Sequence, residues 1–211
     1  MKLIGMLDSP YVRRVAVALQ LMGVPFKHQS LSVFRGYAQF REINPVVKAP
    51  TLLFDDGEVL MDSMLILQYA EKLAARSLLP AEPAALRRDL RLTGLALAAC
   101  EKAVQIVYEH NVRPPEKVHQ PWMDRVHEQL RAACAALEKE LAEAPLAVGA
   151  DGGELTQAGV CTAVVWKFIQ DLVPDSAPAA DYPTIAAFSE VAEALPAFKA
   201  APHGDGTYPV A

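Results

Sequence analysis

The alternation of apolar and polar positions in the first 78 residues predicts short strands separated by helices. Apolar runs at residues 3–7 and 26–31 have the length and the flanking turn residues of β-strands. Between them, apolar residues recur at helical spacing over residues 12–22, and we expect Arg13 and Arg14 on the exposed surface of that helix. A strand, a helix and a second strand in this order imply two parallel strands joined by a right-handed crossover.

Two more strands and a helix follow a stretch of irregular sequence. Residues 52–54 and 59–61 are apolar, and Asp56-Gly57 between them is a strong signal for a hairpin turn. Ser63 then precedes an apolar run at helical spacing, where a side-chain oxygen can cap the first free N–H groups of a helix. The complete order predicts a four-stranded mixed sheet covered by helices.

After the proline-rich linker at residues 79–83, the apolar patterns are helical. We therefore predict an α/β domain at residues 1–78 and an all-helical domain at residues 84–211. The expected helices of the second domain span residues 84–113, 122–143, 156–172 and 183–194, and a further helix begins at Pro196. The third of these is apolar on nearly all sides, so we expect it in the middle of the bundle, and we expect the tail at 204–211 to be loose.

Composition and charge exclude several classes of protein. Apolar residues make up 52% of the chain, which is too many for a disordered protein. The net charge is −5, but residues 1–78 carry nine Lys/Arg against seven Asp/Glu, and residues 79–211 carry eleven against eighteen. The first domain is therefore the better place for a small anionic ligand. Basic runs of the kind that bind nucleic acid are absent from the sequence, and no apolar run approaches the roughly 20 residues that cross a bilayer, so we expect a cytoplasmic protein.

The cysteines and histidines give no sign of redox or metal chemistry. Cys100, Cys134 and Cys161 lie far apart in helical patterns, and we expect them to be reduced and buried. A dithiol reductase would carry Cys-x-x-Cys at the start of the first helix, where this chain has Ser9-Pro10-Tyr11-Val12. The five histidines show no ligand spacing on a common face, so no metal is expected.

Two helix starts in the first domain could bind a small anionic peptide. Ser9-Pro10 opens one helix and Asp62-Ser63 opens another, and the positive end of a helix attracts anions. Asp62-Ser63 follows soon after Pro50 in the sequence. The second helix start can therefore lie beside the backbone that precedes this proline. Taken alone, each dipeptide is equally a plain N-cap, which is a common feature with no chemistry attached.

Taken together, these segments resemble the cytosolic glutathione transferase family, strongly over residues 1–75 and mostly in architecture beyond them. The resemblance is carried by Ser9-Pro10-Tyr11-Val12-Arg13-Arg14-Val15, by Asn44-Pro45-Val46-Val47-Lys48-Ala49-Pro50-Thr51-Leu52, and by Asp62-Ser63 with the helix that follows. It implies a thioredoxin-like domain that binds glutathione as co-substrate, with Pro50 in the cis form. It also implies that Ala49 pairs through its backbone with the cysteinyl residue, and that Ser63 and Asp62 hold the carboxylate and the ammonium of the γ-glutamyl group. Lys48 would lie near the glycine end.

The resemblance further implies a catalytic role for Ser9, at the position where the theta- and zeta-like classes keep a serine. A free thiol has a pKa of about 8.5, and a hydroxyl donor at a helix N-terminus favours the thiolate. Tyr11 is a rival donor two residues later. The implied activity is transfer of glutathione to a small electrophile by a homodimeric enzyme, with the electrophile bound between the domains. The implied pocket residues are Leu7, Tyr11, Phe34, Tyr108 and Val112.

Two alternatives remain open, and the chain departs from the family pattern at two places. The alternatives are a zeta-type glutathione-dependent isomerase or dehalogenase, and a non-catalytic relative of the stringent-starvation type that binds partner proteins. Retention of Ser9 and of Asp62-Ser63 argues against the second. Ala49 replaces the usual valine, which a backbone contact tolerates. Thr156-Gln157-Ala158-Gly159 has glycine where the family's central helix has the acid of its capping box, an expected loss of about 1 kcal/mol.

Overall fold

The computed structural model describes residues 1–209, which form two compact units. The first unit contains residues 1–78, 150–153 and the described part of 194–211, and the second contains residues 79–149 and 154–193. The C-terminal residues therefore cluster with the α/β unit, although the sequence pattern assigns them to the helical domain. The elements of the first unit are β1 (Lys2–Ile4), α1 (Pro10–Leu21), β2 (Lys27–Gln29), α2 (Tyr37–Ile43), β3 (Thr51–Leu53), β4 (Val59–Met61), α3 (Ser63–Ala70), η2 (Ala150–Gly152) and α8 (Pro196–Ala200).

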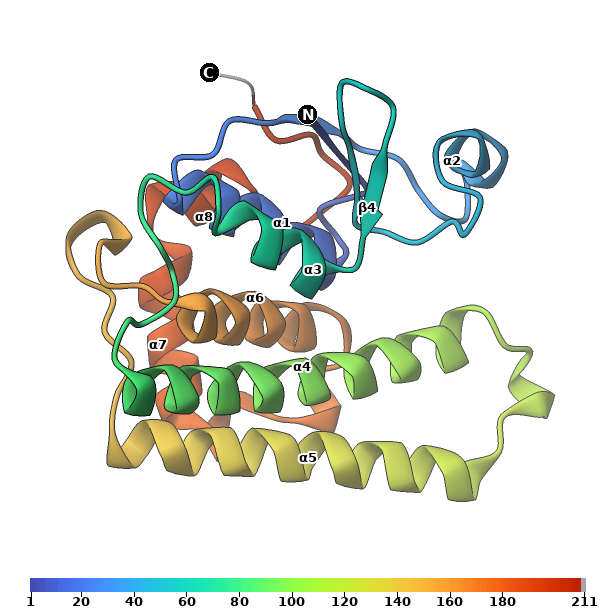
Figure 1. The fold of residues 1–211 in the computed structure, drawn as a ribbon. Helices are drawn as coiled ribbons and strands as arrows, with labels where there is room; N and C mark the ends of the chain where they lie inside the picture. The colour runs from blue at the N-terminus through green and yellow to red at the C-terminus, as the bar shows by residue number, and fades with distance from the viewer. Residues whose placement is uncertain (210–211) are drawn as a thin grey trace. The chain divides into compact units, whose positions relative to one another are not determined.

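The first unit has the four-stranded mixed sheet that the sequence predicts, in the order β2-β1-β3-β4. β1 pairs in parallel with β2 and antiparallel with β3, so that Leu3 lies opposite both His28 and Leu52. β3 and β4 form the antiparallel hairpin around Asp56-Gly57. Helices α1 and α3 pack side by side, and α2 lies apart from them (Figure 1).

Both arginines of α1 are buried, so the prediction that they lie on the helix surface is wrong. Arg13 donates a hydrogen bond from Nε to the carbonyl oxygen of Ala201 at 2.7 Å, and its guanidinium lies over the ring of Phe198 at 5.8 Å from the centroid. Arg14 donates from Nη1 to the hydroxyl of Ser63 on α3 at 3.2 Å. Arg13 thus binds the C-terminal segment to α1, which explains why that segment belongs to this unit.

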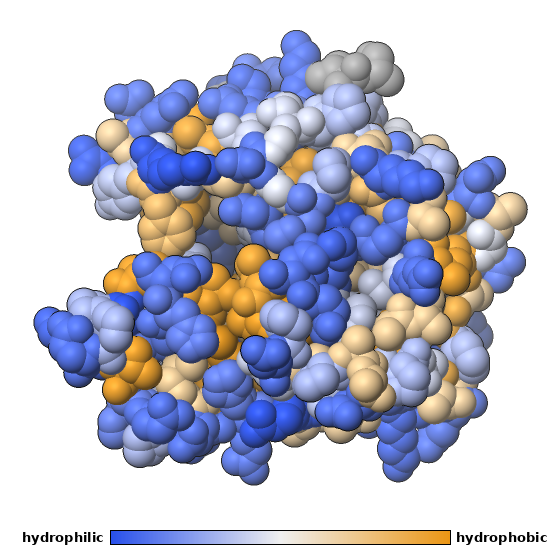
Figure 2. Space-filling model, turned by 180° about the vertical axis from the view of Figure 1, so that it is seen from behind, coloured by the Kyte–Doolittle hydropathy of each residue, from blue (hydrophilic) through white to orange (hydrophobic). Residues whose placement is uncertain are grey.

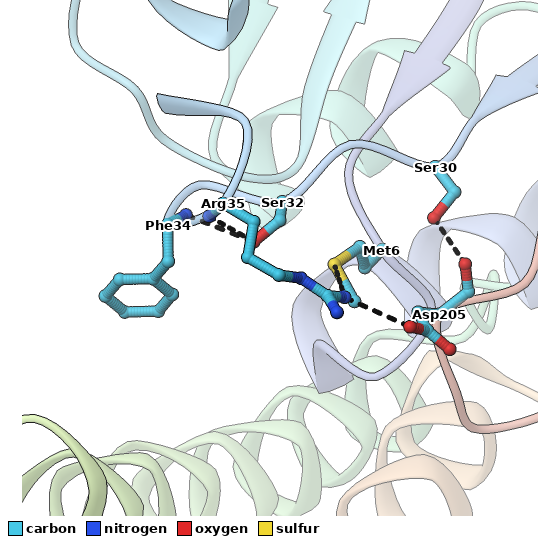
Figure 3. A network of polar contacts seen from close by, with 6 residues as sticks. All are labelled: Met6, Ser30, Ser32, Phe34, Arg35 and Asp205. Atoms are coloured by element: carbon cyan, nitrogen blue, oxygen red, sulfur yellow. Dashed lines mark hydrogen bonds and ion pairs between the residues drawn. The ribbon is translucent and has the colours of Figure 1, made fainter. Parts of the chain in front are cut away.

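The described part of the tail is attached, contrary to the expectation that it is loose. Ser30 Oγ donates to the carbonyl oxygen of Asp205 at 2.6 Å, and the carboxylate of Asp205 forms an ion pair with Arg35 at 3.0 Å (Figure 3). The ring of Tyr208 packs on that of Phe26, with centroids 4.8 Å apart. Residues 210–211, also included in that expectation, lie outside the described residues.

His28 joins the tail to the first strand and fixes its own protonation state. Nδ1 accepts a hydrogen bond from the backbone N–H of Tyr208 at 2.7 Å, so Nε2 carries the proton and donates it to the carbonyl oxygen of Gly5, also at 2.7 Å. Burial lowers the pKa of His28 from its ordinary value of 6.5, and the bond to Gly5 opposes that shift more weakly.

We expect acid to release the tail at Tyr208 as the pH falls below about 6.5. The folded chain disfavours a charged His28, so the unfolded or detached chain binds the proton first. The neutral His28 therefore stabilises the attached tail above pH 6.5, and this stabilisation is lost as the pH falls through the lowered pKa of His28. Amide exchange of residues 203–208, corrected for intrinsic rates, should accelerate over this range in the parent protein. The variant His28→Gln still contains His203 and should show no such transition. An equal transition in both proteins would contradict the assignment of the transition to His28.

The second unit is a helical bundle in which α4, α5, α6 and α7 pack against one another (Figure 1). Helix α6 is buried over most of its length, as its largely apolar sequence predicts. All three cysteines are buried and none of them forms a disulfide, and burial raises the pKa of Cys134 to about 12. The elements of this unit are α4 (Pro83–Asn111), η1 (Pro115–Lys117), α5 (Gln120–Glu143), α6 (Gln157–Leu172), η3 (Pro174–Ser176), η4 (Ala179–Asp181) and α7 (Pro183–Glu193).

The start of α6 is capped from another helix. Thr156 stands at the N-cap position, but its side chain makes no capping hydrogen bond. Instead, Oδ1 of Asp89 on α4 accepts from the N–H of Ala158 at 3.2 Å. A Cβ on Gly159 would lie 2.8 Å from Cδ2 of Leu155, so a larger residue here would displace that buried side chain. Asp89 thus replaces the Thr156 side chain as the acceptor for a free N–H of the first turn, and it does not replace the acid of the capping box, which would bond the N–H of Thr156 itself.

Hydrophilic side chains cover most of the face seen in Figure 2, with exposed hydrophobic residues in smaller groups between them. Within residues 1–209, none of the helices is both long enough and apolar enough to cross a membrane.

Candidate functional site

Ser9 caps α1 and keeps its hydroxyl proton available. Its backbone is extended, its carbonyl accepts from the N–H of Arg13, and its Oγ accepts from the N–H of Val12 at 3.4 Å. This long contact uses a lone pair of the oxygen, so the O–H can donate to another group. The capping role and the predicted role as hydrogen-bond donor to a thiolate are therefore compatible at one residue.

The loop ahead of β3 has the predicted cis bond between Ala49 and Pro50. Gly5 brings this loop close to α1, because a Cβ at Gly5 would lie 2.6 Å from Cγ2 of Val12 and 3.1 Å from Cβ of Ala49. The backbone of Gly5 has φ of +137°, which glycine alone adopts readily. The end of β1, the start of α1 and the Ala49-Pro50 loop therefore meet at one place.

A buried network of hydrogen bonds holds the same loop in place. The hydroxyl of Thr51 donates to the carbonyl oxygen of Lys48 at 2.7 Å and accepts from the side-chain amide of Asn44 at 2.8 Å. Asn44 Oδ1 also accepts from the N–H of Val46 at 3.0 Å. Asn44 and Thr51 are both buried. Sequence reasoning quoted these residues only as part of a motif and gave neither of them a role, although buried polar groups in a loop must find such partners.

The N-cap of α3 is Asp62, one residue earlier than the sequence predicts. Its Oδ1 accepts from the N–H of Met64 at 2.9 Å, and its backbone has φ of +76°. Ser63 is the first residue of the helix and is only 3% exposed. Its Oγ accepts from Arg14 rather than from a backbone N–H. The structure therefore brings both predicted residues to the helix N-terminus, with different local roles.

Lys48 also lies at this end of the site. Its Nζ is 3.3 Å from Oδ2 of Asp62, and both side chains are about half exposed. The resemblance implies that Lys48 and Asp62 serve opposite ends of the tripeptide, whereas the structure has them in contact. Because an exposed ion pair is weak, a ligand ammonium group can compete with Lys48 for the Asp62 carboxylate.

A pocket with several polar lining residues surrounds the contacts drawn in Figure 3. Met6 joins the pocket to the site, because its carbonyl oxygen accepts from the N–H of Ser9 at 3.2 Å. Across it, Arg35 reaches both the sulfur of Met6 at 3.8 Å and the carboxylate of Asp205. The pocket is lined by Met6, Ser30, Leu31, Ser32, Arg35, Gly36 and Asp205.

The residues that the resemblance assigns to the electrophile pocket differ in their exposure. Leu7 is completely buried, whereas its neighbour Met6 lines the polar pocket, and the part of Leu7 in an electrophile pocket stays a prediction. Phe34 is 55% exposed, and its ring points away from Met6 and Asp205 (Figure 3). Tyr11 lies on α1 and is partly buried.

Tyr108 and Val112 belong to the second unit, at the end of α4, and both are exposed. Their part in an electrophile pocket stays a prediction, like that of Tyr11 and Phe34.

The charged groups around the pocket affect one another. Burial raises the pKa of Asp8, and the nearby imidazole of His203 opposes this. The ion pair with Arg35 lowers the pKa of Asp205. Among residues 1–209, no three His, Cys, Asp or Glu side chains are grouped as metal ligands would be. The site is therefore built from hydroxyl, amide, carboxylate and guanidinium groups.

Known proteins resemble this chain in sequence and in fold. The family profile of the glutathione S-transferase N-terminal domain matches residues 3–78. A crystal structure of a glutathione transferase family member from Pseudomonas fluorescens Pf-5, with bound glutathione, is 30% identical and superposes with a TM-score of 0.81. The superposition covers 95% of this chain and 97% of that one.

The chain belongs to the glutathione transferase family.

Two further relatives are similar to this glutathione transferase over most of its length. The uncharacterized GST-like protein YibF of Escherichia coli K12 is 29% identical over 150 residues, which cover 69% of this chain and 72% of YibF. A maleylacetoacetate isomerase from Methylobacterium extorquens AM1, crystallised with malonate and glutathione, is 28% identical. It superposes with a TM-score of 0.70 over 95% of each chain.

Proposed function

We propose that the protein activates glutathione as a thiolate and transfers it to a small electrophile. Ser9 would donate its hydroxyl proton to the sulfur, and the backbone of Ala49 would pair with the cysteinyl residue. Asp62 and Ser63 would bind the ammonium and the carboxylate of the γ-glutamyl group. A relative of 30% identity is crystallised with glutathione, which supports this ligand.

The observation that carries the proposal is the convergence of three binding segments on α1. Ser9 opens that helix, Gly5 places Ala49 against its first turn, and Arg14 on the same helix holds Ser63. The positive ends of α1 and α3 both favour a ligand with negative charge. A scaffold protein would have no need for these segments to meet.

Stabilisation of the thiolate needs only modest energy. Lowering a thiol pKa by two units requires about 2.7 kcal/mol. One charge-assisted hydrogen bond from Ser9 and the dipole of the 12-residue helix α1 together reach that range. Ser9 is thus a donor and not a nucleophile.

Calorimetric titration with glutathione, followed by assays with a panel of electrophiles, tests the proposal. The panel should include an aryl halide, an epoxide and an α,β-unsaturated carbonyl compound. We expect saturable binding at or below millimolar glutathione and consumption of thiol with at least one electrophile. Absence of binding at millimolar concentrations would end the proposal and favour a role in binding partner proteins.

A second candidate is glutathione-dependent isomerisation, favoured by the likeness to the maleylacetoacetate isomerase of Methylobacterium extorquens. Isomerisation returns the thiol unchanged at the end of each cycle. Conversion of maleylacetoacetate without loss of free thiol would therefore identify this activity, whereas transfer consumes one thiol for each product.

A further inference from the structure

The pocket drawn in Figure 3 contains a guanidinium group that uses little of its hydrogen-bonding capacity. The guanidinium of Arg35 lies between the sulfur of Met6 and the carboxylate of Asp205. Its Nη2 is 3.0 Å from Oδ2 of Asp205 and 3.8 Å from the sulfur. Within residues 1–209, the N–H groups of Nε and Nη1 reach no acceptor, and the side chain is 73% exposed. Arginine has five N–H donors in a planar fork that fits a carboxylate through two parallel bonds, so Arg35 retains donors for a ligand.

Asp205 occupies the place that a ligand carboxylate would take. It reaches the pocket from the C-terminal segment, 170 residues after Arg35 in the sequence. It pairs with the guanidinium through one of its two oxygens, and its side chain is 66% exposed. An exposed ion pair of this kind is weak. A carboxylate that binds the guanidinium through both oxygens would therefore displace Asp205.

Exchange of one carboxylate for the other does not require the tail to detach. The backbone of Asp205 is held separately, because its carbonyl oxygen accepts from Ser30 Oγ at 2.6 Å. Three residues later, the N–H of Tyr208 donates to Nδ1 of His28. Rotation of the Asp205 side chain alone can therefore release the guanidinium.

The other lining residues suit the carbon skeleton and the second oxygen of a small acid. Met6 and Leu31 provide apolar side chains in the same pocket. Ser32 Oγ accepts from the N–H groups of Phe34 and Arg35, both at 3.1 Å, so its hydroxyl proton remains free to donate to a ligand. The pocket thus combines a cation, a hydroxyl donor and apolar surface, a set that is complementary to a carboxylate on an apolar chain or ring.

The pocket and the proposed sulfur donor belong to one loop. The carbonyl oxygen of Met6 accepts from the N–H of Ser9 at 3.2 Å, and the side chain of Met6 contacts Arg35. A ligand in the pocket is therefore held by the same loop that carries Ser9.

We propose that this pocket selects electrophiles that carry a carboxylate, and that Arg35 is the residue that binds this carboxylate. Asp205 pairs with the guanidinium when no such substrate is present and competes with the substrate for it. The inference rests on the proposed function, because it places the acidic electrophile beside a glutathione whose sulfur is held by Ser9.

The test measures the binding of S-substituted glutathiones by calorimetry. Two conjugates carry an acid, S-carboxymethylglutathione and S-(4-carboxybenzyl)glutathione, and each is compared with the conjugate that has an amide in place of this acid. We expect the parent protein to bind at least one acid conjugate about five- to tenfold more tightly than its amide. Arg35→Gln should abolish this preference and leave the affinity for unmodified glutathione at the parent value. The matched control Arg41→Gln removes an exposed arginine from α2 and should change neither quantity.

Removal of the competing charge should have the opposite effect. Asp205→Asn keeps the backbone bond to Ser30 and should increase the preference for the acid by a further two- to fivefold or so. In the double variant with Arg35→Gln this gain should vanish, because the guanidinium for which Asp205 competes is gone. A gain of the same size in the double variant would show that Asp205 acts by general charge repulsion, and it would overturn the role of Asp205 as a competitor.

The remaining outcomes separate the inference from the proposed function. If glutathione binds but neither acid conjugate is preferred, or if Arg35→Gln retains the preference, the inference is wrong and the proposed function stands. An equal loss of affinity for every ligand in Arg35→Gln, unmodified glutathione included, would assign Arg35 to a carboxylate of the tripeptide and would also overturn the inference. Failure of the parent protein to bind glutathione or any conjugate would overturn the proposed function and the inference with it.

Discussion

Replacement of Ser9 by alanine is expected to raise the pKa of the bound glutathione thiol by about one to two units. At pH 7, a rise of the thiol pKa from about 6.5 to between about 7.5 and 8.5 lowers the thiolate fraction, and kcat should fall by about three- to twenty-fivefold where the chemical step limits the rate. Glutathione affinity should change little, because Ala49, Asp62 and Ser63 supply the contacts to the peptide. The thiolate absorbance of the complex, titrated against pH, measures the shift directly.

Two control variants separate this role from helix capping. Ser9→Thr keeps the hydroxyl and should keep the lowered thiol pKa, whereas Ser9→Ala also loses about 1 kcal/mol of capping stability. Tyr11→Phe removes the rival hydroxyl without touching the cap. An unchanged thiol pKa in Ser9→Ala together with a raised one in Tyr11→Phe would move the donor role to Tyr11.

The fold was largely predictable because its signals are local. Pro10 and Pro183 stand at helix starts, and Asp56-Gly57 makes the hairpin turn, where the backbone conformation of single residues decides the structure. The apolar sequence of α6 likewise predicts its burial without knowledge of its neighbours. The attachment of the tail has no local signal, because it depends on His28 and Arg35, more than 150 residues away in the sequence.

The same distinction explains what was missed at the site. Ser9 and Asp62 cap helices that begin next to them, so the sequence places them correctly at helix starts. Arginine is buried only when distant groups receive its N–H donors, and an isolated reading of α1 puts it on the surface. The partners of Arg14 lie on α3, 49 and 50 residues further along the chain. Only the three-dimensional structure joins these groups.

Replacement of Asp89 by alanine is expected to destabilise the second unit by about 3 kcal/mol. The side chain is 4% exposed and accepts a buried hydrogen bond from the N–H of Ala158 at the start of α6. A hydrogen bond to a charged group contributes about 1.5–3 kcal/mol, and a negative charge at a helix N-terminus adds up to about 1 kcal/mol or more when partly buried. The midpoint of urea unfolding, at an unchanged m-value, measures the loss.

The matched control is Thr156→Ala at the nominal N-cap. Its hydroxyl makes no capping bond and has no hydrogen-bond partner in residues 1–209, so the change should stay within about 0.5 kcal/mol. Gly159→Asp restores the family's capping box in sequence but should not stabilise the protein. A Cβ there would press on Leu155, which is itself buried and would have to move within a packed core. A large loss in Thr156→Ala with little in Asp89→Ala, or a gain in Gly159→Asp, would show that α6 is capped from its own sequence and not from α4.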